Sequence, residues 1–393
     1  MTKIRITEKL KKQIIAGKQL LLTQDFSNIA KQLDTLPDNQ VVELLDTKDT
    51  FVASAYLSAQ NKGIGWVYSN KKDSFSYQLL VERFERAKEL RAHYFKQSLT
   101  NAFCLFNDEG DCLGGLRVEL YHEFVIFSWY NAFIAQQQDL IVAAFQAVFP
   151  EIKGGYAKNR FKGANLESEH IFGEMHPNVN IILENGIQYA THLNDGLMTG
   201  IFLDQREVRG RLLEHYARDR RVLNLFSYTA AFSVAAAMGG ALETTSVDLA
   251  KRSVELSRAH FELNQIDLSH HRFVVMDTFE YYKYASRKGL KYDLIIIDPP
   301  SFARNKRKVF SVQKNYRDLI EGALSLLNPN GVIIASTNAQ NYPIADFKKM
   351  LKNSLVNHQY EFKEVFRLPS DYRSNPKQID SNYLKVFVIE VKK

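Results

Sequence analysis

Polar residues directly after an apolar run mark the first place where this sequence could do chemistry. The stretch Leu294 to Phe302, LIIIDPPSF, places a carboxylate, two prolines and an aromatic ring after a hydrophobic strand. Asp298 and the carbonyl of Pro299 can accept hydrogen bonds, while Pro299 and Pro300 bring no competing backbone donor. Phe302 offers a ring on which a flat group can stack. We therefore predict that this stretch binds a planar heterocycle that carries an amino group. The alternative is a rigid turn that binds no ligand.

A second polar stretch follows an earlier apolar segment. Ser227, Tyr228 and Thr229 come after the expected strand 222–226, and Ala230 leads a helix. The first amides of that helix and the hydroxyls beside them can hold a polar ligand tail.

Two further acids end the next two apolar segments. Asp248, about 20 residues after the first strand, can accept hydrogen bonds from a ribose diol, and Asp277 can reach an adenine amine. Each acid alone could be a strand-end cap. A G-x-G-x-x-G fingerprint is absent, which disfavours a dinucleotide. A nucleoside without pyrophosphate but with a charged amino-acid tail fits the set, namely S-adenosylmethionine, with Leu249 and Thr278 lying beside it.

The elements expected from about residue 191 onward explain how these polar ends could meet. Strands at 222–226, 244–248, 273–276, 292–298 and 331–336 alternate with helices at 230–238, 249–264 and 313–327, before a last strand at 383–391. This pattern predicts a Rossmann-like, doubly wound, mostly parallel sheet in which the first and fourth strands are neighbours. Ligands bind beyond the carboxyl ends of such strands, so the polar stretches face one crevice.

The remaining chain predicts two smaller domains. Residues 1–72 read as a small β-rich domain, and residues 73–190 as an α+β middle domain that opens with a connecting helix at 76–95. In that middle domain we expect strands at 102–106, 116–120, 124–129, 152–157 and 181–189 and a helix at 138–148. Residues 191–393 form the third domain.

Composition limits the class of protein. The chain has 393 residues and a net charge of +7, with basic residues in excess in 1–72 and 190–393 and acidic residues in excess between them. Such fields suit a polyanion partner or a solvated surface. No apolar run approaches the roughly 20 residues of a membrane span, and the N-terminus lacks a signal-peptide core, so we expect a cytoplasmic protein. The two cysteines, Cys104 and Cys112, make no metal-ligand spacing, so no metal is expected.

Four motifs resemble one known family. TGIFLDQRE (Thr199 to Glu207), NLFSYTAAF (Asn224 to Phe232), SVDLA (Ser246 to Ala250) and IIIDPPSF (Ile295 to Phe302) are similar to bacterial class I methyltransferases of 23S ribosomal RNA. That family includes a cytosine-C5 and a guanine-N7 enzyme. The N-terminal LLLTQDF and LPDNQVVELLDTKDTFVASAYLS resemble its PUA-like RNA-binding module.

The resemblance implies roles for particular residues. The positions of Phe226, Ser227, Asp248, Asp277 and Asp298 contact S-adenosylmethionine in the family. Those of Phe202, Asp204, Gln205 and Arg206 border its pocket.

Three departures from the family pattern affect the chemistry. Ala230 and Ala231 stand where cytosine-C5 relatives have glycines, and Met198 replaces a common lysine. The family's cysteine falls in the strand where this chain has Ala335 to Asn338. Because C5 methylation normally requires a thiolate at C6, we expect methylation of a nitrogen, with guanine the favoured base. Asn338 could read a base edge or could be a turn residue.

Basic residues follow the Asp-Pro-Pro turn. Arg304, Lys306, Arg307 and Lys308 could contact RNA phosphates in a salt-sensitive, sequence-independent way, or could form a solvated loop. We expect ribosomal RNA as partner, no membrane, and a homodimer as an open option. The rival hypotheses are an RNA-binding or ribosome-assembly protein with a non-catalytic Rossmann domain, and a DNA adenine methyltransferase.

Overall fold

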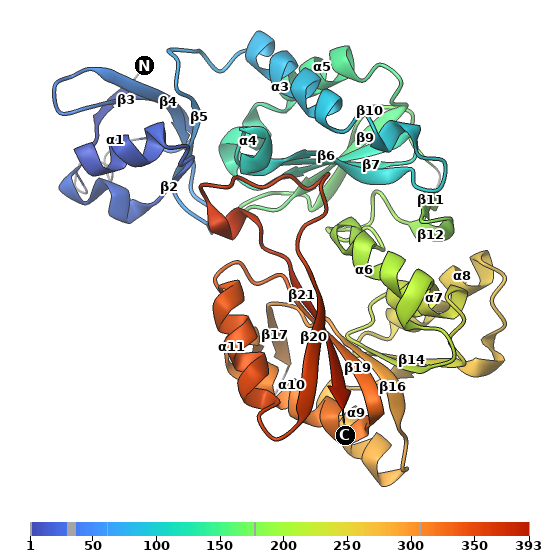
Figure 1. The fold of residues 1–393 in the computed structure, drawn as a ribbon. Helices are drawn as coiled ribbons and strands as arrows, with labels where there is room; N and C mark the ends of the chain where they lie inside the picture. The colour runs from blue at the N-terminus through green and yellow to red at the C-terminus, as the bar shows by residue number, and fades with distance from the viewer. Residues whose placement is uncertain (1, 30–36, 61, 177, 306–307, 393) are drawn as a thin grey trace. The chain divides into compact units, whose positions relative to one another are not determined.

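The chain forms two compact units in a computed structural model that describes residues 2–29, 37–60, 62–176, 178–305 and 308–392 (Figure 1). The first unit comprises Met1–Ile182, His192–Thr199 and Ser370–Asn382. The second comprises Leu183–Thr191, Gly200–Pro369 and Tyr383–Lys393. No helix in the described parts of the chain has the length and hydrophobicity needed to cross a membrane.

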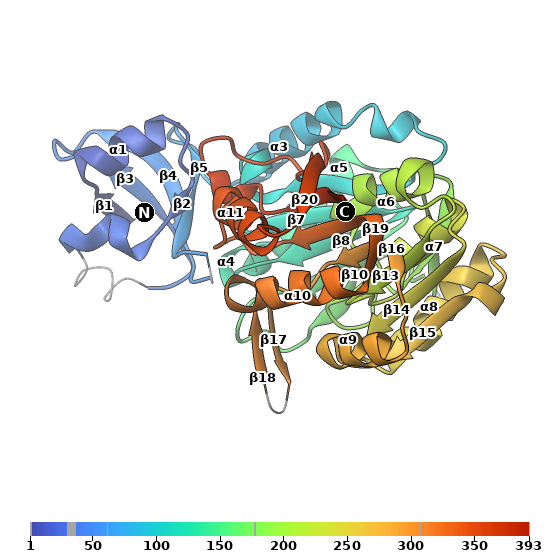
Figure 2. The ribbon, with the colours of Figure 1, turned by 60° about the horizontal axis from the view of Figure 1, so that its bottom comes forward.

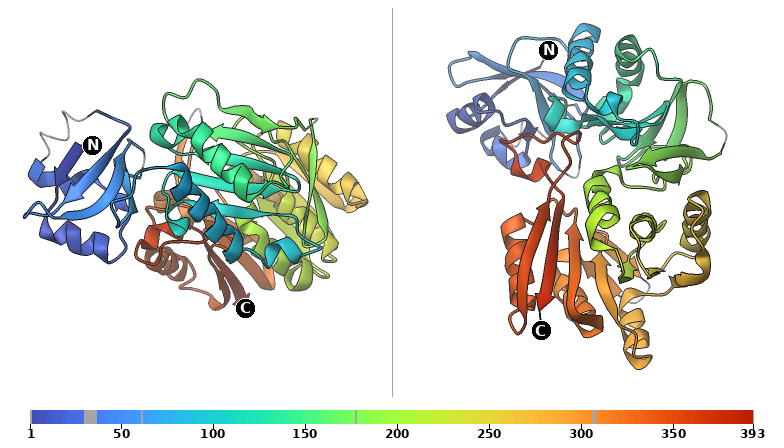
Figure 3. Two further views of the ribbon diagram at one scale, coloured as in Figure 1. Left: turned by 90° about the horizontal axis from the view of Figure 1, so that it is seen from above. Right: turned by 45° about the vertical axis from the view of Figure 1, so that its right-hand side comes forward.

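The first unit begins with a five-stranded sheet. Its strands, in spatial order, are β1 (Thr2–Arg5), β3 (Gln40–Leu45), β4 (Phe51–Leu57), β5 (Gly65–Ser69) and β2 (Leu20–Leu21). The β1 strand runs parallel to β3, and the other pairs are antiparallel. Helix α1 (Glu8–Ile15) lies beside this sheet (Figure 3). The Thr7 hydroxyl caps the helix, and Leu10 and Ile14 are buried in the same core. The 3₁₀ segment η1 (Thr23–Ile29) completes this part.

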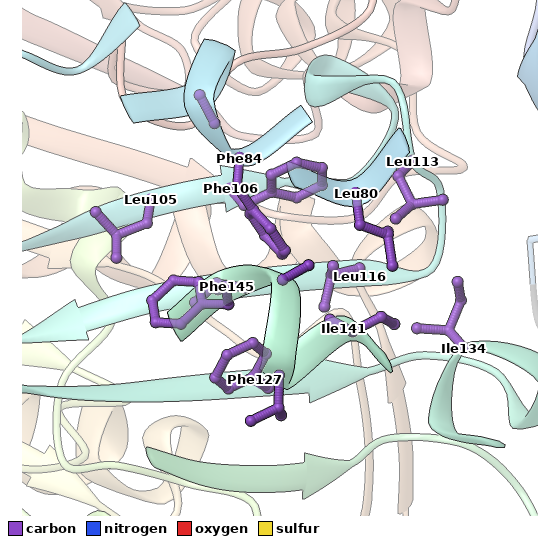
Figure 4. Packing of buried hydrophobic residues seen from close by; sticks show 14 of the residues in the cluster. Leu80, Phe84, Leu105, Phe106, Leu113, Leu116, Phe127, Ile134, Ile141 and Phe145 are labelled. Atoms are coloured by element: carbon purple, nitrogen blue, oxygen red, sulfur yellow. The ribbon is translucent and has the colours of Figure 1, made fainter. Parts of the chain in front are cut away.

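A second sheet of the first unit packs against helices. Its strand order is β10 (Ser168–Gly173), β9 (Gly154–Asn159), β8 (Phe124–Trp129), β7 (Leu116–Tyr121) and β6 (Ala102–Asn107). Its helical segments are α3 (Tyr77–Leu90), η2 (Tyr94–Lys96), η3 (Asp108–Asp111), α4 (Ala132–Gln136) and α5 (Gln138–Val148). Aromatic side chains fill the space between α3, α5 and the sheet, with the rings of Phe84 and Phe145 5.4 Å apart (Figure 4).

Residues 370–382 return late in the chain to this first unit. The buried guanidinium of Arg91 anchors them, because Nη2 donates to the carbonyl of Asp371 and to Oδ2 of Asp111, both at 2.6 Å. The Asp371 carboxylate also accepts a bond from the backbone N–H of Cys104. Sequence patterns did not predict this return, since it depends on pairs of residues more than 250 positions apart.

A seven-stranded sheet forms the centre of the second unit. Its order is β15 (His271–Val275), β14 (Glu243–Asp248), β13 (Arg221–Leu225), β16 (Tyr292–Ile297), β19 (Leu327–Thr337), β21 (Lys385–Lys392) and β20 (Gln359–Phe366). The first five strands are parallel, and β21 is antiparallel to both of its neighbours. Along the chain, β13 is the first strand of this sheet and β16 is the fourth, and these two strands are paired. The doubly wound sheet expected from the sequence is confirmed.

Two groups of helices cover this sheet (Figure 2). One group is α9 (Thr278–Arg287), α10 (Val312–Leu326) and α11 (Ile344–Ser354); the other is α6 (Arg206–Arg211), the π-helix η5 (Leu212–Tyr216), α7 (Ala231–Met238) and α8 (Arg252–Leu263). Leu294 to Ile297 are fully buried between them, which explains why this part of β16 is a continuous apolar run instead of an alternating pattern.

Short elements complete the second unit and include one correction. The single strand expected at 181–189 is wrong: β11 (Asn180–Glu184) and β12 (Ile187–Thr191) form a hairpin. Its turn residues Asn185 and Gly186 have φ of 52° and 78°, as an Asn-Gly turn between paired strands favours. A second hairpin, β17 (Phe302–Asn305) with β18 (Lys308–Ser311), was not anticipated, nor were α9, α11 and β20. The short 3₁₀ segments of the second unit are η4 (Leu203–Gln205) and η6 (Leu268–His270), whereas η7 (Ile379–Ser381) belongs to the first unit.

Candidate active site

The turn after β13 adopts an unusual backbone conformation. Phe226, Tyr228 and Ala230 have φ of 58°, 50° and 58°, the left-handed region that side chains with a Cβ normally avoid. Two backbone bonds hold the turn: Ser227 N–H donates to Val247 at 3.0 Å and Ala230 N–H donates to Ser227 at 2.7 Å. Strained backbone of this kind gathers at ligand sites, where the surrounding fold maintains it. The turn leads into α7, whose first N–H groups have no acceptor within the helix.

Asp248 ends β14 and is tied to that turn. Its Oδ2 accepts the N–H of Tyr228 and its Oδ1 the N–H of Ala250, both at 2.9 Å. A carboxylate has about four lone-pair sites, so each oxygen can accept one more donor such as a ribose hydroxyl. Leu249 beside it is 55% exposed and offers an apolar surface at the strand end.

Asp277 lies two residues beyond the outer strand β15 and caps helix α9. Its Oδ1 accepts the N–H groups of Phe279 and Glu280 at 3.0 and 3.3 Å. The capping alternative for this residue is therefore realised, and among the described residues Oδ2 receives no hydrogen bond. Thr278 is buried at the first position of α9.

The segment from Gly200 to Arg206 is fastened to the same turn. The N–H of Gly200 donates to the Tyr228 hydroxyl at 3.0 Å, and the Thr229 hydroxyl donates to the Gly200 carbonyl at 2.6 Å. Phe202, which is 45% exposed, places its ring 5.8 Å from that of Tyr228. The family positions near residues 202–206 and 226–229, far apart in the sequence, are thus brought together.

A buried ion pair between Arg209 and Glu184 holds the segment from Gly200 to Arg206 in place. Arg209 donates from Nε and Nη2 to the two oxygens of Glu184 at 2.6 and 2.7 Å, and Nη2 also donates to the carbonyl of Phe202 at 2.8 Å. Both side chains are almost fully buried. Removing one partner would leave an uncompensated buried charge, so the pair constrains the path of the backbone at Phe202.

Gln205 and Asp298 lie at the tips of neighbouring elements. The Gln205 amide donates to the Ser336 hydroxyl at 2.8 Å and to Asp298 Oδ2 at 3.2 Å, while Asp204 accepts the Tyr383 hydroxyl at 2.7 Å. The Gln205 Oε1 atom is buried and has no partner among the described residues. A buried acceptor without a hydrogen-bond donor lowers the free energy of unfolding, so we expect a bound ligand to donate a hydrogen bond to this oxygen.

The electrostatic environment of Asp298 is also unusual. Although the residue keeps some exposed surface, desolvation of its carboxyl group raises the pKa to about 6. The hydrogen bond from Ser336 works against this rise, and the negative charge of Asp204 adds to it. A carboxyl group with a pKa near neutrality is common where proton transfer or a charged ligand must be handled.

The other residues of the Asp-Pro-Pro turn occupy different environments. Pro299 is buried, Pro300 is exposed, and Phe302 is 62% exposed at the start of β17. Tyr316, from α10, lies with its hydroxyl 3.0 Å from the carbonyl of Ile297 and 2.8 Å from that of Ser336, which holds the ends of β16 and β19 together.

Some predicted residues cannot be placed in the site. Lys306 and Arg307 lie outside the described residues, and for Arg304 and Lys308 only the strand backbone is described, where Arg304 pairs with Val309 and Lys308 with Asn305. Arg206 is buried at the start of α6.

Sequence reasoning overlooked two supporting residues. Buried His260 of α8 places Nδ1 3.0 Å from the carbonyl of Thr229 and Nε2 3.0 Å from that of Ala190. Ser336 approaches Asp298 from β19. The strand-end position of Ser336 could have signalled a role, whereas the helical position of His260 carries no such signal.

The sheet order and the polar residues at the ends of β13, β14, β15 and β16 define a class I methyltransferase architecture. The chain also matches the family model described as S-adenosylmethionine-dependent methyltransferase over residues 156–370, and a PUA-like domain model over residues 4–70. The chain belongs to this S-adenosylmethionine-dependent methyltransferase family.

Individual relatives agree with this assignment. The chain is 40% identical over 348 residues to YwbD of Bacillus subtilis, named as a candidate ribosomal RNA large subunit methyltransferase, covering 87% of this chain and 88% of that protein. It is 31% identical over 359 residues to ribosomal RNA large subunit methyltransferase I of Yersinia pestis, covering 90% of each chain.

Solved structures extend the likeness to the whole fold. A crystal structure of SMU.776, a candidate methyltransferase in complex with SAH, superposes with a TM-score of 0.94 at 50% identity and covers 100% of both chains. A candidate methyltransferase of Streptococcus mutans gives a TM-score of 0.92 at 49% identity, again over 100% of both chains. The cofactor class expected from the strand-end residues is confirmed. Within the described residues, no group of three or more His, Cys, Asp or Glu side chains could hold a metal ion.

Proposed function

We propose that this chain transfers a methyl group from S-adenosylmethionine to a nitrogen of a base in large-subunit ribosomal RNA. The observation that carries the choice of nitrogen is Asp298, an acceptor at the tip of β16 with a pKa raised to about 6, combined with a sequence of the second unit that contains no cysteine. The two relatives named above support ribosomal RNA as the substrate class.

The amino-acid tail of the cofactor would be held by two parts of the site. The bent turn at Ser227 to Thr229 and the start of α7 suit the carboxylate of its amino-acid tail. The unpaired Oε1 of Gln205 suits its ammonium group, between Asp204 and Arg206.

The nucleoside part fits the outer strands. Asp248 would accept the ribose hydroxyls and Asp277, through its open Oδ2, the adenine amine. Leu249 and Thr278 would flank the adenine ring, and Phe202 and Phe226 would close the pocket on the side of the methionine chain.

The target base would meet the Asp-Pro-Pro turn. Asp298 and the carbonyl of Pro299 accept hydrogen bonds from an amino or imino group, Pro300 stiffens the turn, and exposed Phe302 stacks on the flipped-out base. The sulfonium of S-adenosylmethionine supplies an electrophilic methyl group, so alignment of the attacking nitrogen is the main task of the protein. Asp298, ionised at neutral pH, can take a proton that the nitrogen gives up.

Methylation at cytosine C5 is disfavoured by the residues present. It requires a nucleophile that adds to C6, which a thiolate normally provides. Both cysteines belong to the first unit, where Cys104 is buried in β6 with a pKa well above its usual range because of desolvation. The matching strand end in β19 carries Ser336, Thr337 and Asn338 instead.

RNA binding beyond the target base would come from two basic segments. Arg304, Lys306, Arg307 and Lys308 follow the base-holding turn directly in the sequence, and the PUA-like domain would bind structured RNA. We place the reaction in the cytoplasm, as expected from the sequence, and keep the homodimer as a prediction.

A labelled-methyl assay tests the proposal. Purified protein is incubated with methyl-labelled S-adenosylmethionine and either unmodified large-subunit ribosomal RNA or duplex DNA, and the product is mapped by mass spectrometry. We expect label in RNA alone, on a base nitrogen. Label in duplex DNA, or a 5-methylcytosine product, would contradict the proposal, and no calorimetric binding of S-adenosylhomocysteine would point to the non-catalytic alternative.

A further inference from the structure

Asn338 directly follows β19 and contacts the segment of the Asp-Pro-Pro turn. In the β16–β19 register Ile297 lies opposite Ala335, so the next residue of each segment, Asp298 just after β16 and Ser336 within β19, lies at the same level. Asn338, two residues beyond Ser336, is exposed. Its Oδ1 accepts the hydroxyl of Ser301, from the turn itself, at 2.6 Å.

The backbone around Asn338 is held on both sides. The Tyr316 hydroxyl lies 2.8 Å from the carbonyl of Ser336, and Lys385 Nζ donates to the carbonyl of Ala339 at 2.6 Å. The Thr337 hydroxyl accepts the N–H of Ala339 at 3.2 Å. Asn338 is therefore an exposed side chain on a rigid support, and little conformational entropy is lost when such a group binds a ligand.

The bond from Ser301 sets the direction of the Asn338 amide. With Oδ1 engaged by Ser301, the amide turns its Nδ2 group, which donates two hydrogen bonds, away from the turn. No partner for Nδ2 occurs among the described residues. Asp298 is an acceptor in the turn to which Ser301 belongs, so Nδ2 of Asn338 adds a donor on this side of the site.

We propose that Asn338 is a specificity-determining residue that donates from Nδ2 to a carbonyl oxygen on the target base, with Ser301 as its positioning residue. This inference rests on the proposed function and narrows it to bases with a carbonyl group, among which guanine remains the favoured base. Adenine has no carbonyl group. A paired contact to its amine and ring nitrogen would need Oδ1 as well as Nδ2, and Oδ1 already accepts the hydrogen bond from Ser301.

The test compares variants on the RNA that the wild-type protein methylates. Asn338→Asp keeps the shape of the side chain but replaces the donor by an acceptor, and Ser301→Ala releases the amide. Asn341→Asp, an exposed residue in the loop after the same strand, makes the same charge change and serves as the matched control. Calorimetry with S-adenosylhomocysteine and thermal unfolding are recorded for each variant.

We expect Asn338→Asp to lower kcat/KM for RNA about 10- to 100-fold, which is the effect of losing one good base contact, and Ser301→Ala to lower it less. Affinity for S-adenosylhomocysteine and the unfolding temperature should stay unchanged, and Asn341→Asp should behave as wild type. Replacing the target guanine by 2-aminopurine, which lacks the carbonyl oxygen, should cost wild type a similar factor and Asn338→Ala almost nothing.

The outcomes separate the two proposals. Wild-type protein that methylates RNA, together with an Asn338→Asp variant of equal efficiency or an adenine as the mapped target, would overturn the role of Asn338 alone. Wild-type protein that binds S-adenosylhomocysteine but methylates no ribosomal RNA would overturn the proposed function and, with it, this inference.

Discussion

The side-chain amide of Gln205 lies 3.2 Å from Oδ2 of Asp298, although the two residues are 93 positions apart. Through this contact the segment before α6 and the tip of β16 share one polar cluster, in which Gln205 also reaches Ser336 at 2.8 Å. The cluster joins the proposed cofactor side of the site to the proposed base side. Substitutions in this cluster should have different effects, because Oε1 of Gln205 has no hydrogen-bond partner among the described residues whereas Asp298 has a raised pKa.

Asp298→Asn should nearly abolish turnover. The variant keeps the size of the side chain but cannot take a proton, and loss of a general base costs about 100-fold or more. With a pKa of about 6, the carboxyl group of the wild-type protein is protonated as the pH falls below 6, so kcat should decline there. Rates of methyl transfer between pH 5 and 8 check this, and full activity of Asp298→Asn would remove Asp298 from the mechanism.

The same substitution should stabilise the fold at neutral pH. The pKa of Asp298 is about 6 in the folded chain against an ordinary 3.8, so its contribution to stability is greatest below pH 4 and is lost as the pH rises through 6. Asp298→Asn should therefore raise the free energy of unfolding by about 1–3 kcal/mol at pH 7 and change it little at pH 4. Urea unfolding at both pH values measures this. Asp318→Asn, at an exposed position of α10, should show no comparable gain.

Gln205→Ala should weaken cofactor binding. Loss of the unpaired buried acceptor removes one hydrogen bond to a charged ligand group, worth about 1.5–3 kcal/mol, or more than tenfold in Kd. Calorimetric titration with S-adenosylhomocysteine measures the change in Kd. Gln188→Ala, at an exposed position of β12, is the control. Unaltered affinity would mean that the ammonium group of the cofactor lies elsewhere.

Glycine at position 230 should be tolerated or stabilising. Ala230 has φ of 58°, a conformation that costs a residue with a Cβ about 1–2 kcal/mol, and glycine would release most of this despite its larger entropy in the unfolded chain. Ala237→Gly, inside α7, should instead destabilise by about 1 kcal/mol. Denaturant unfolding compares the two, and equal losses for both would show that the turn is not strained.

His260→Phe should destabilise the fold through backbone groups. The imidazole lies between the carbonyls of Thr229 and Ala190 and can donate a hydrogen bond to at least one of them, and a phenyl ring would remove that donor. A cost of about 1–3 kcal/mol is expected for an unsatisfied group. Urea unfolding checks this, with His270→Phe at an exposed position as the control. Because Thr229 belongs to the turn that we propose to bind the cofactor, the affinity for S-adenosylhomocysteine should also fall.

Local patterns were sufficient where a residue's role follows from its place in one element. Asp248, Asp277 and Asp298 were predicted at strand ends because apolar runs stop there, and the doubly wound sheet followed from alternating strands and helices. The hairpin of β11 and β12 was missed although its Asn-Gly turn is a local signal, since the flanking apolar residues read as one strand.

The sequence by itself determined which chemistry is available: acids and hydroxyls at strand ends, no thiol near the Asp-Pro-Pro turn, and a cofactor without pyrophosphate. Only the tertiary structure decided which groups meet. The contacts of Gln205 with Asp298, of Ser301 with Asn338 and of His260 with Thr229 join residues 31 to 93 positions apart. Periodicity and turn signals act over a few residues, whereas such pairs form only when strand order, register and helix packing have placed their backbones side by side.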